Sequence, residues 1–279
     1  MFRVNRARRA SADRIMREPS DTGPAPRRRA IYLLPNLLTT GTIFAGFYGI
    51  VASIDGHYTP ACIAVFVAAL LDGMDGRLAR LTHTESEFGK NYDSLADMVA
   101  FGMAPAIIVY QWGLKALAEY GWAWGKLGWL AAFLYVVAAA LRLARFNVAA
   151  KTTDRAFFEG LPSPSAAGLV ASMVWLETQL GLGGLPALAV STAITVTAGV
   201  LMVSRFPYYS FKELAPRGRI SFAYVFVIPL VFVLIALDPP TVCFIIALLY
   251  ALSGIVTTLW RRRRRRRQSG SSRRHEGSA

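Results

Sequence analysis

The sequence predicts an all-helical integral membrane protein, and three observations support this fold class. Of the 279 residues, 54% are hydrophobic and only 17% are charged, a composition typical of polytopic membrane proteins. The chain contains eight apolar stretches close to the roughly 20 residues that a helix needs to cross a bilayer. Of the 31 lysines and arginines, all except Lys115 and Lys126 fall where eight crossings would place them on one side of the membrane.

These eight stretches are predicted to be transmembrane helices, because backbone groups in lipid must form their hydrogen bonds within the chain. In chain order they cover residues 35–53, 59–79, 93–113, 127–147, 164–181, 185–204, 220–237 and 240–259. Positively charged loops stay in the cytoplasm, so both termini are expected there. Residues 32–260 would form one transmembrane domain in the cell membrane.

Two basic segments flank this domain. We expect residues 1–31 to be a cytoplasmic or surface-lying arm, and residues 261–279 to be a polyarginine run followed by a disordered cytoplasmic tail. The net charge of +14 would also suit nucleic acid. However, the arginines directly follow the last span, so anionic membrane lipids are the expected partners and nucleic acid is not. The alternative is that the arginines only fix the topology.

Four aspartates interrupt the apolar pattern at the cytoplasmic ends of the second and third spans. Ionisable residues at membrane depth are costly and are normally functional. At about 100° per residue, Asp72 and Asp75 share one face of the second helix, and Asp93 and Asp97 share one face of the third. The turn at residues 81–88 is expected to bring the two faces together.

Four convergent carboxylates repel one another unless cations neutralise them. Hard divalent cations with oxygen ligands, Mg²⁺ or Mn²⁺, are the natural partners. Two such ions about 4 Å apart suit phosphoryl chemistry. Small residues at Gly76, Ala79 and Gly89 would let a bulky ligand approach the helix backbone, and Arg80 would face a phosphate. The sequence therefore predicts a two-metal site for a phosphate-containing substrate.

The spacing of these residues resembles, at every position, the signature of the CDP-alcohol phosphatidyltransferase family: Asp72-x-x-Asp75-Gly76-x-x-Ala79-Arg80, eight residues, Gly89-x-x-x-Asp93-x-x-x-Asp97. The resemblance implies a homodimeric membrane enzyme with a six-helix core, here followed by two C-terminal helices, and a cytoplasm-facing site. Such enzymes move a phosphatidyl group from a CDP-linked lipid to an alcohol and release CMP. The four aspartates would hold two divalent metals, and Asp97 would also be the general base.

The same resemblance implies which residues contact the substrates. Gly76, Ala79, Arg80 and Gly89 would bind CDP-diacylglycerol, and Asn36 and Thr39 of the stretch PNLLT would reach the nucleotide. The stretches SEFG, DSLADMVAFGMAPA, RLARFN and FFEGLPSPSAAG resemble the bacterial and archaeal phosphatidylserine synthase branch, which implies L-serine as the acceptor.

Serine needs hydrogen-bond donors for its carboxylate and an acceptor for its ammonium group. Arg142 and Arg145 supply bidentate donors, and Asn147 offers both polarities. The alternative is that both arginines only determine topology at a helix end.

Two other functions stay open. A sister enzyme would use glycerol 3-phosphate or inositol phosphate, whose phosphate groups would need additional basic anchoring. A cation transporter would use the four carboxylates to coordinate a translocated ion. Transporters often show internal repeats and charges near the bilayer midplane. This sequence shows no internal repeat, and its acidic residues gather near the cytoplasmic face of the membrane.

Overall fold

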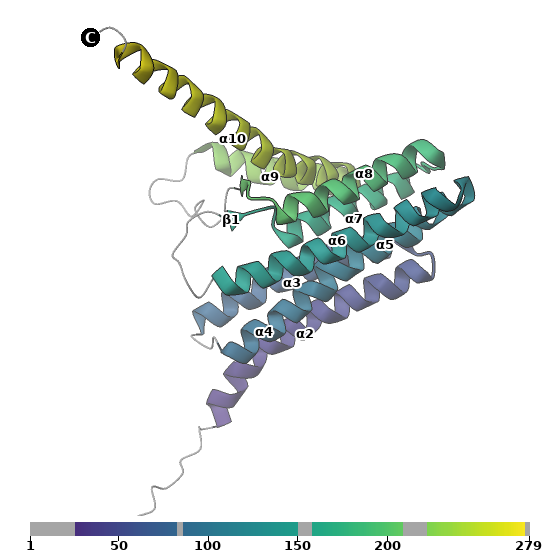
Figure 1. Ribbon diagram of the computed structural model, residues 1–279. Helices are drawn as coiled ribbons and strands as arrows, with labels where there is room; N and C mark the ends of the chain where they lie inside the picture. Colours follow the sequence, from purple (N-terminus) through teal and green to yellow (C-terminus); the bar gives the residue numbers. More distant parts are fainter. Residues whose placement is uncertain (1–25, 83–85, 150–157, 209–221, 277–279) are drawn as a thin grey trace, which may run out of the picture.

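The computed structural model describes residues 26–82, 86–149, 158–208 and 222–276, and these residues are almost entirely helical. Their helices pack side by side in one bundle (Figure 1). The helices, in chain order, are α2 (Pro26–Ile54), α3 (Tyr58–Leu81), α4 (Glu87–Asp97), the π-helix η1 (Met98–Met103), α5 (Ala104–Trp112), the 3₁₀-helix η2 (Leu114–Tyr120), α6 (Trp122–Ala149), α7 (Ser163–Gln179), α8 (Gly184–Val203), α9 (Phe222–Leu237) and α10 (Pro239–Glu276).

Five helical stretches among the described residues are long and apolar enough to cross a membrane, which agrees with the predicted multi-pass fold. They are Leu34–Ile54, Glu87–Tyr120, Trp122–Val148, Gly184–Val203 and Pro239–Thr258. The other predicted spans correspond to α3, α7 and α9. Of these, α3 carries the first two aspartates of the signature, α7 has 17 residues and α9 has 16. Length and composition of the described helices therefore support five spans.

The third predicted span is not one regular α-helix. It runs from α4 through η1 and α5 to η2, and the π-helix begins directly after Asp97. Two neighbours hold this irregular turn. On α2, a Cβ atom added to Gly46 would lie 2.7 Å from the Cα atom of Ala100. On α6, the buried hydroxyl of Tyr135 donates a 3.1 Å hydrogen bond to the carbonyl oxygen of Phe101. Close packing from both sides therefore fixes the backbone that follows Asp97.

Helix α7 lies at the centre of the bundle and contacts α3, α5, α8 and α10. Most of its side chains are buried, and many are small, including Ala166, Ala167, Gly168 and Ala171. Small side chains let helix backbones approach closely in a membrane, where the hydrophobic effect gives little drive for association. This packing places the first residue of α7, Ser163, deep in the structure at 1% exposure.

A short pair of strands connects the start of α7 and the end of α8 to α10. The two-residue strands β1 (Phe158–Glu159) and β2 (Pro207–Tyr208) pair antiparallel. From β2, the buried Tyr208 hydroxyl donates a 3.0 Å hydrogen bond to the carbonyl oxygen of Ala251. Burial raises the pKa of Tyr208 to about 12, so the phenol keeps the proton that it donates. A side chain at Gly254 would overlap the Tyr208 ring.

The ends of the described chain differ from the predicted boundaries. Helix α2 already begins at Pro26, within the predicted arm, whose residues 1–25 lie outside the described residues. Helix α10 continues through the arginine run to Glu276, where we expected a disordered tail. Arginine is a good helix former, which accounts for this continuation. The start of α2, the end of α10, α4 and β1 all lie toward the same end of the bundle (Figure 1).

Candidate functional site

The turn between α3 and α4 sets the position of the second pair of aspartates. Helix α3 ends at Leu81, and α4 begins after the N-cap residue Ser86, whose hydroxyl accepts a 3.0 Å hydrogen bond from the backbone N–H of Gly89. A serine at this position satisfies one of the free N–H groups of a helix N-terminus. The cap therefore fixes where α4 starts, and with it the helix face that carries Asp93 and Asp97.

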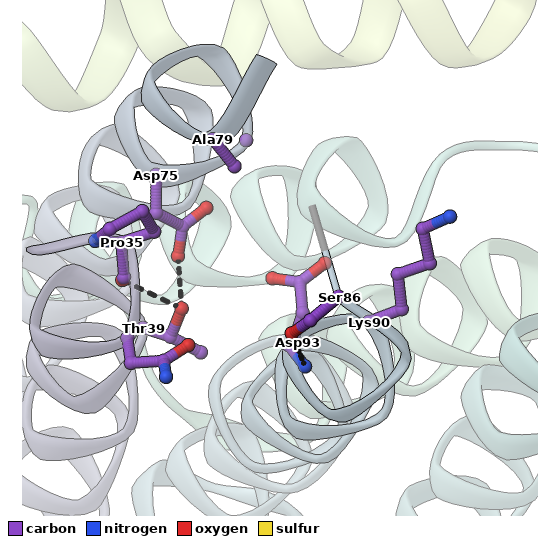
Figure 2. Close-up of a pocket in the computed structure, with 10 residues that line it drawn as sticks. Pro35, Thr39, Asp75, Ala79, Ser86, Lys90 and Asp93 are labelled. Carbon is purple, nitrogen blue, oxygen red and sulfur yellow. Dashed lines mark hydrogen bonds between the residues drawn. The ribbon is translucent and has the colours of Figure 1, made fainter. Parts of the chain in front are cut away.

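The structure brings the four signature aspartates together, as the helical spacing predicted. One carboxylate oxygen from each of Asp72, Asp75 and Asp93 lies within 4.8 Å of the other two. The carboxyl group of Asp97 is in hydrogen-bonding contact with that of Asp72. Figure 2 shows the side chains of Asp75 and Asp93 pointing into the space between their helices. Two helices thus present a compact cluster of oxygen ligands.

Two carboxylate oxygens of this cluster lack hydrogen-bond partners among the described residues, as expected of a site that binds a cation. The hydroxyl of Thr39, on α2, donates a 2.8 Å hydrogen bond to Oδ2 of Asp75 (Figure 2). In contrast, Oδ1 of Asp93 and Oδ1 of Asp97 are buried and have no hydrogen-bond partner among the described residues. Buried carboxylate oxygens without partners are costly. Hard divalent cations bind such oxygens, so the donor set fits them.

A pocket of about 180 Å³ opens beside the cluster, and α2, α3 and the start of α4 form its walls. Its lining residues are Pro35, Asn36, Thr39, Asp75, Gly76, Ala79, Ser86, Gly89, Lys90 and Asp93. The sequence-predicted residues Asn36, Thr39, Gly76, Ala79 and Gly89 therefore share one pocket with two of the aspartates. At Gly76, an added Cβ atom would meet no atom within 4 Å, so a ligand can approach the backbone there.

Three lining residues, Pro35, Ser86 and Lys90, were not among the predicted site residues. The stretch SEFGK contained a signal for Ser86 and Lys90, because a serine followed by an acidic residue is typical of a helix start and places the lysine in the first turn. Arg80, in contrast, was predicted to face a phosphate. It is exposed, and its Nε donates a 2.8 Å hydrogen bond to the carbonyl oxygen of Gly76 in its own helix. Its side chain therefore lies along α3, outside the pocket lining.

Residues 32–204, more than half of the chain, match the family described as CDP-alcohol phosphatidyltransferase. This chain belongs to the CDP-alcohol phosphatidyltransferase family. It is 37% identical over 232 residues to the CDP-diacylglycerol–serine O-phosphatidyltransferase of Helicobacter pylori, a match that covers 82% of this chain and 92% of the relative.

Two further relatives come from other organisms. The protein of the same description from Mycobacterium leprae is 32% identical over 230 residues, covering 80% of this chain and 74% of its own length. The archaetidylserine synthase of Methanothermobacter thermautotrophicus is 36% identical over 177 residues, covering 63% and 69%. The family match ends at residue 204, so α9 and α10 lie beyond it.

In this phosphatidyltransferase, the three residues predicted to bind the acceptor occupy different surroundings. Arg142, near the end of α6, is mostly buried, and its Nη1 donates a 2.7 Å hydrogen bond to Oγ of Ser163. Its charge interacts with that of Asp97, and its Nε is buried without a hydrogen-bond partner among the described residues. Arg142 therefore links the start of α7 to the edge of the aspartate cluster.

Arg145 and Asn147 lie farther along α6 and are both exposed. The Nδ2 of Asn147 donates a 3.0 Å hydrogen bond to Oγ of Ser94, the neighbour of Asp93 on α4. The charge of Arg142 thus interacts with that of Asp97. Asn147 lies at the exposed edge of the aspartate cluster, where it contacts Ser94.

Proposed function

We propose that this phosphatidyltransferase moves the phosphatidyl group of CDP-diacylglycerol to L-serine and forms phosphatidylserine and CMP. One structural observation carries the proposal: Asp97 has an unpartnered buried acceptor, Oδ1, and Arg142, whose charge interacts with that of Asp97, has an unpartnered buried donor, Nε, among the described residues. A molecule that has both a hydroxyl group and a carboxylate satisfies both atoms, and serine is such a molecule. Relatives named for transfer to serine support this acceptor.

The aspartate cluster is the proposed site of two divalent cations, Mg²⁺ or Mn²⁺, held by Asp72, Asp75, Asp93 and Asp97. When bound, such ions disperse the charge of the substrate diphosphate and of the departing CMP. The pocket beside the cluster is the proposed site of the nucleotide part of CDP-diacylglycerol. Its glycine and alanine positions, Gly76, Ala79 and Gly89, leave room for the ligand, and Asn36 and Thr39 line the side formed by α2.

Two cationic side chains complete the proposed binding site of CDP-diacylglycerol. Lys90 adds a positive charge to the lining of the pocket. Arg80 sits one helical turn beyond Gly76, whose carbonyl oxygen it contacts, and a change of rotamer would bring its guanidinium toward a bound phosphate. Both would attract the diphosphate before the reaction and hold it in place during the reaction.

Asp97 is the proposed general base. As the serine oxygen forms a bond to phosphorus, the bond between phosphorus and the CMP oxygen breaks, and Asp97 takes the proton of the serine hydroxyl. Alignment of the hydroxyl with the diphosphate contributes much of the rate, because a hydroxyl group is a weak nucleophile. The π-helix after Asp97 is packed between α2 and α6, and this packing would hold Asp97 in place for that alignment.

Arg142 is the proposed partner of the serine carboxylate, since its planar guanidinium donates parallel hydrogen bonds to such a group. Asn147 and Arg145 would form the outer part of this acceptor site, where Asn147 is held by Ser94. Arg142 would favour an acceptor with a single carboxylate, because a phosphate-bearing acceptor would need further buried cations.

We also propose the topology that the charge distribution predicts. All eight predicted spans would cross the cell membrane, with both termini and the active site in the cytoplasm. The shared location of the start of α2, the end of α10 and α4 at one end of the bundle supports this arrangement (Figure 1). The proposed domains are the arm at residues 1–31, the transmembrane domain at residues 32–260 and the basic tail at residues 261–279, which would contact anionic lipids. A homodimer is proposed from the family.

Purified protein in detergent or vesicles tests the function. With CDP-diacylglycerol and Mg²⁺ or Mn²⁺, serine should stimulate CMP release, whereas glycerol 3-phosphate and inositol phosphate should not. Stimulation by one of the phosphate acceptors instead would identify a sister enzyme, and the absence of serine-dependent release would overturn serine as the acceptor.

The base assignment has its own test. Asp97→Asn should lower kcat about 10²- to 10⁴-fold. Asp55→Asn, at an exposed turn between α2 and α3, is the matched control and should retain activity. CMP release by Asp97→Asn at the wild-type rate would overturn the assignment.

A further inference from the structure

We propose that Tyr92, on α4, is a positioning residue for CDP-diacylglycerol. Its hydroxyl group ties α4 to α2, and these helices form two walls of the pocket proposed to hold the nucleotide. The inference rests on the proposed function and deepens it, because Tyr92 is not among the lining residues of the pocket and acts on the substrate through the walls.

The width of the pocket depends on the spacing between α2 and α4. Figure 2 shows Thr39 of α2 on one side of the pocket and Lys90 and Asp93 of α4 on the other. The two walls come close at Gly89, where an added Cβ atom would lie 3.8 Å from Oδ1 of Asn36. A small movement of α4 relative to α2 therefore changes the space available to a ligand.

The aspartate cluster does not hold α4 in this position by itself. Without a cation, the carboxylates on α3 and α4 repel one another and push the two helices apart. Other neighbours must oppose this repulsion, and the residues on either side of Asp93 provide contacts that do so. Ser94 accepts a 3.0 Å hydrogen bond from Asn147 of α6. Tyr92 makes the corresponding contact with α2.

The contact with α2 is a chain of two hydrogen bonds. The Tyr92 hydroxyl lies 2.9 Å from Oγ1 of Thr40, and Oγ1 of Thr40 donates a 2.8 Å hydrogen bond to the carbonyl oxygen of Asn36. Because a hydroxyl group has a single proton, the Thr40 proton is used for Asn36 and Tyr92 is the donor to Thr40. The chain thus runs from α4 to the backbone of a residue that lines the pocket.

The ring of Tyr92 is also held by a neighbour on its own helix. Phe88 lies one helical turn earlier, and the two rings stack with 5.9 Å between their centroids and 15° between their planes. Residues four positions apart share a helix face, so this contact follows from the helical spacing. Stacking limits the rotation of the Tyr92 ring and keeps its hydroxyl directed at Thr40.

The proposed acceptor site uses other helices. Arg142 of α6 and Ser163 of α7 form its hydrogen-bonded pair. Loss of the Tyr92 hydroxyl should consequently weaken binding of CDP-diacylglycerol and leave binding of serine intact. A general loss of stability would instead lower the amount of active enzyme and leave both KM values unchanged.

Steady-state CMP release by the full-length enzyme tests this separation. Tyr92→Phe keeps the ring and removes the hydroxyl. It should raise the KM for CDP-diacylglycerol about fivefold, the effect of one hydrogen bond. The kcat and the KM for serine should stay within about twofold of wild type, because saturating substrate holds α4 in place once it is bound. The matched control is Tyr48→Phe, farther along α2, where the side chain is 48% exposed; it should leave all three constants unchanged.

A second variant tests the route through Thr40. Thr40→Val keeps the shape of the side chain and removes the acceptor of the Tyr92 proton, so it should produce the same selective rise. When both substitutions are combined, the second should add less than about a twofold effect. An unchanged KM for CDP-diacylglycerol in Tyr92→Phe, an equal rise in both KM values, or effects that multiply in the double variant would overturn the inference. Wild-type enzyme without serine-dependent CMP release would instead overturn the proposed function.

Discussion

The hydroxyl group of Thr39 donates a 2.8 Å hydrogen bond to Oδ2 of Asp75 across 36 positions of the sequence. Both side chains are nearly inaccessible, with exposures of 5% and 4%. The bond connects α2, which carries none of the signature aspartates, to the carboxylate cluster between α3 and α4. It also holds the Asp75 carboxylate in one orientation, so that its other oxygen stays available to a ligand in the pocket.

Asp75 is a proposed metal ligand, and loss of a hydrogen bond that orients a metal ligand from outside the coordination sphere typically costs 10- to 100-fold in metal affinity or activity. We therefore predict that Thr39→Val, which keeps the shape of the side chain, raises the Mg²⁺ concentration for half-maximal CMP release about tenfold or more. The control is Thr42→Val. Thr42 is also buried on α2, at 1% exposure, but its hydroxyl donates only to the Leu38 carbonyl group of its own helix. Equal Mg²⁺ requirements in the two variants would show that the Thr39 bond has no influence on the metal site.

The aspartate cluster should also make the stability of the protein depend on divalent cations. Without a cation, the four carboxylates repel one another and two of their oxygens lack partners. A ligand that binds only the folded state stabilises it in proportion to the logarithm of its concentration above Kd. We predict that Mg²⁺ or Mn²⁺ raises the Tm of the detergent-solubilised protein even without substrate.

Removal of one carboxylate from the cluster should reduce this stabilisation. Asp93→Asn should show a much smaller rise of Tm with Mg²⁺, while the exposed Asp55→Asn should respond like wild type. Differential scanning fluorimetry measures the Tm of the wild type and of both variants. A rise of the same size in all three proteins would show that the cation binds elsewhere.

The convergence of the aspartates was predictable because it follows from helical periodicity. Residues three or four positions apart share a helix face. Because the turn after Leu81 is short, the acidic faces of α3 and α4 are held close to each other. The structure confirms that Asp72, Asp75 and Asp93 cluster and that Asp97 contacts Asp72. The same reasoning correctly grouped the small residues Gly76, Ala79 and Gly89 around the pocket.

Other features of the site were not predictable from periodicity. An apolar pattern gives the depth of a helix in the membrane but not its neighbours, so nothing in the sequence placed Ser163 of α7 beside Arg142 of α6. The π-helix after Asp97 depends on the close approach of Gly46 and on the hydroxyl of Tyr135, both from other helices. The rotamer of Arg80, which turns back onto α3, depends on a local carbonyl group that competes with the predicted phosphate.

The start of α7 offers a last test, because Gly160 there combines two constraints. Its φ angle of +89° lies in the left-handed region, and an added Cβ atom would overlap the carbonyl oxygen of Met202. Its N–H also donates a 2.9 Å hydrogen bond to the carbonyl oxygen of Phe206. Three residues later, Ser163 holds Arg142. A displaced backbone at Gly160 therefore shifts the group proposed to bind the acceptor carboxylate.

We predict that Gly160→Ala lowers the Tm and also raises the KM for serine. The left-handed conformation costs a residue with a side chain about 1–2 kcal/mol, and overpacking against the Met202 carbonyl group adds about 1–3 kcal/mol. Gly181→Ala isolates the first cost, because Gly181 has a φ of +62° and an added Cβ atom there would meet nothing within 4 Å. It should lower the Tm less and leave the KM for serine unchanged. If the two variants lost equal stability and both kept the wild-type KM, the backbone at Gly160 would have no connection to the acceptor site.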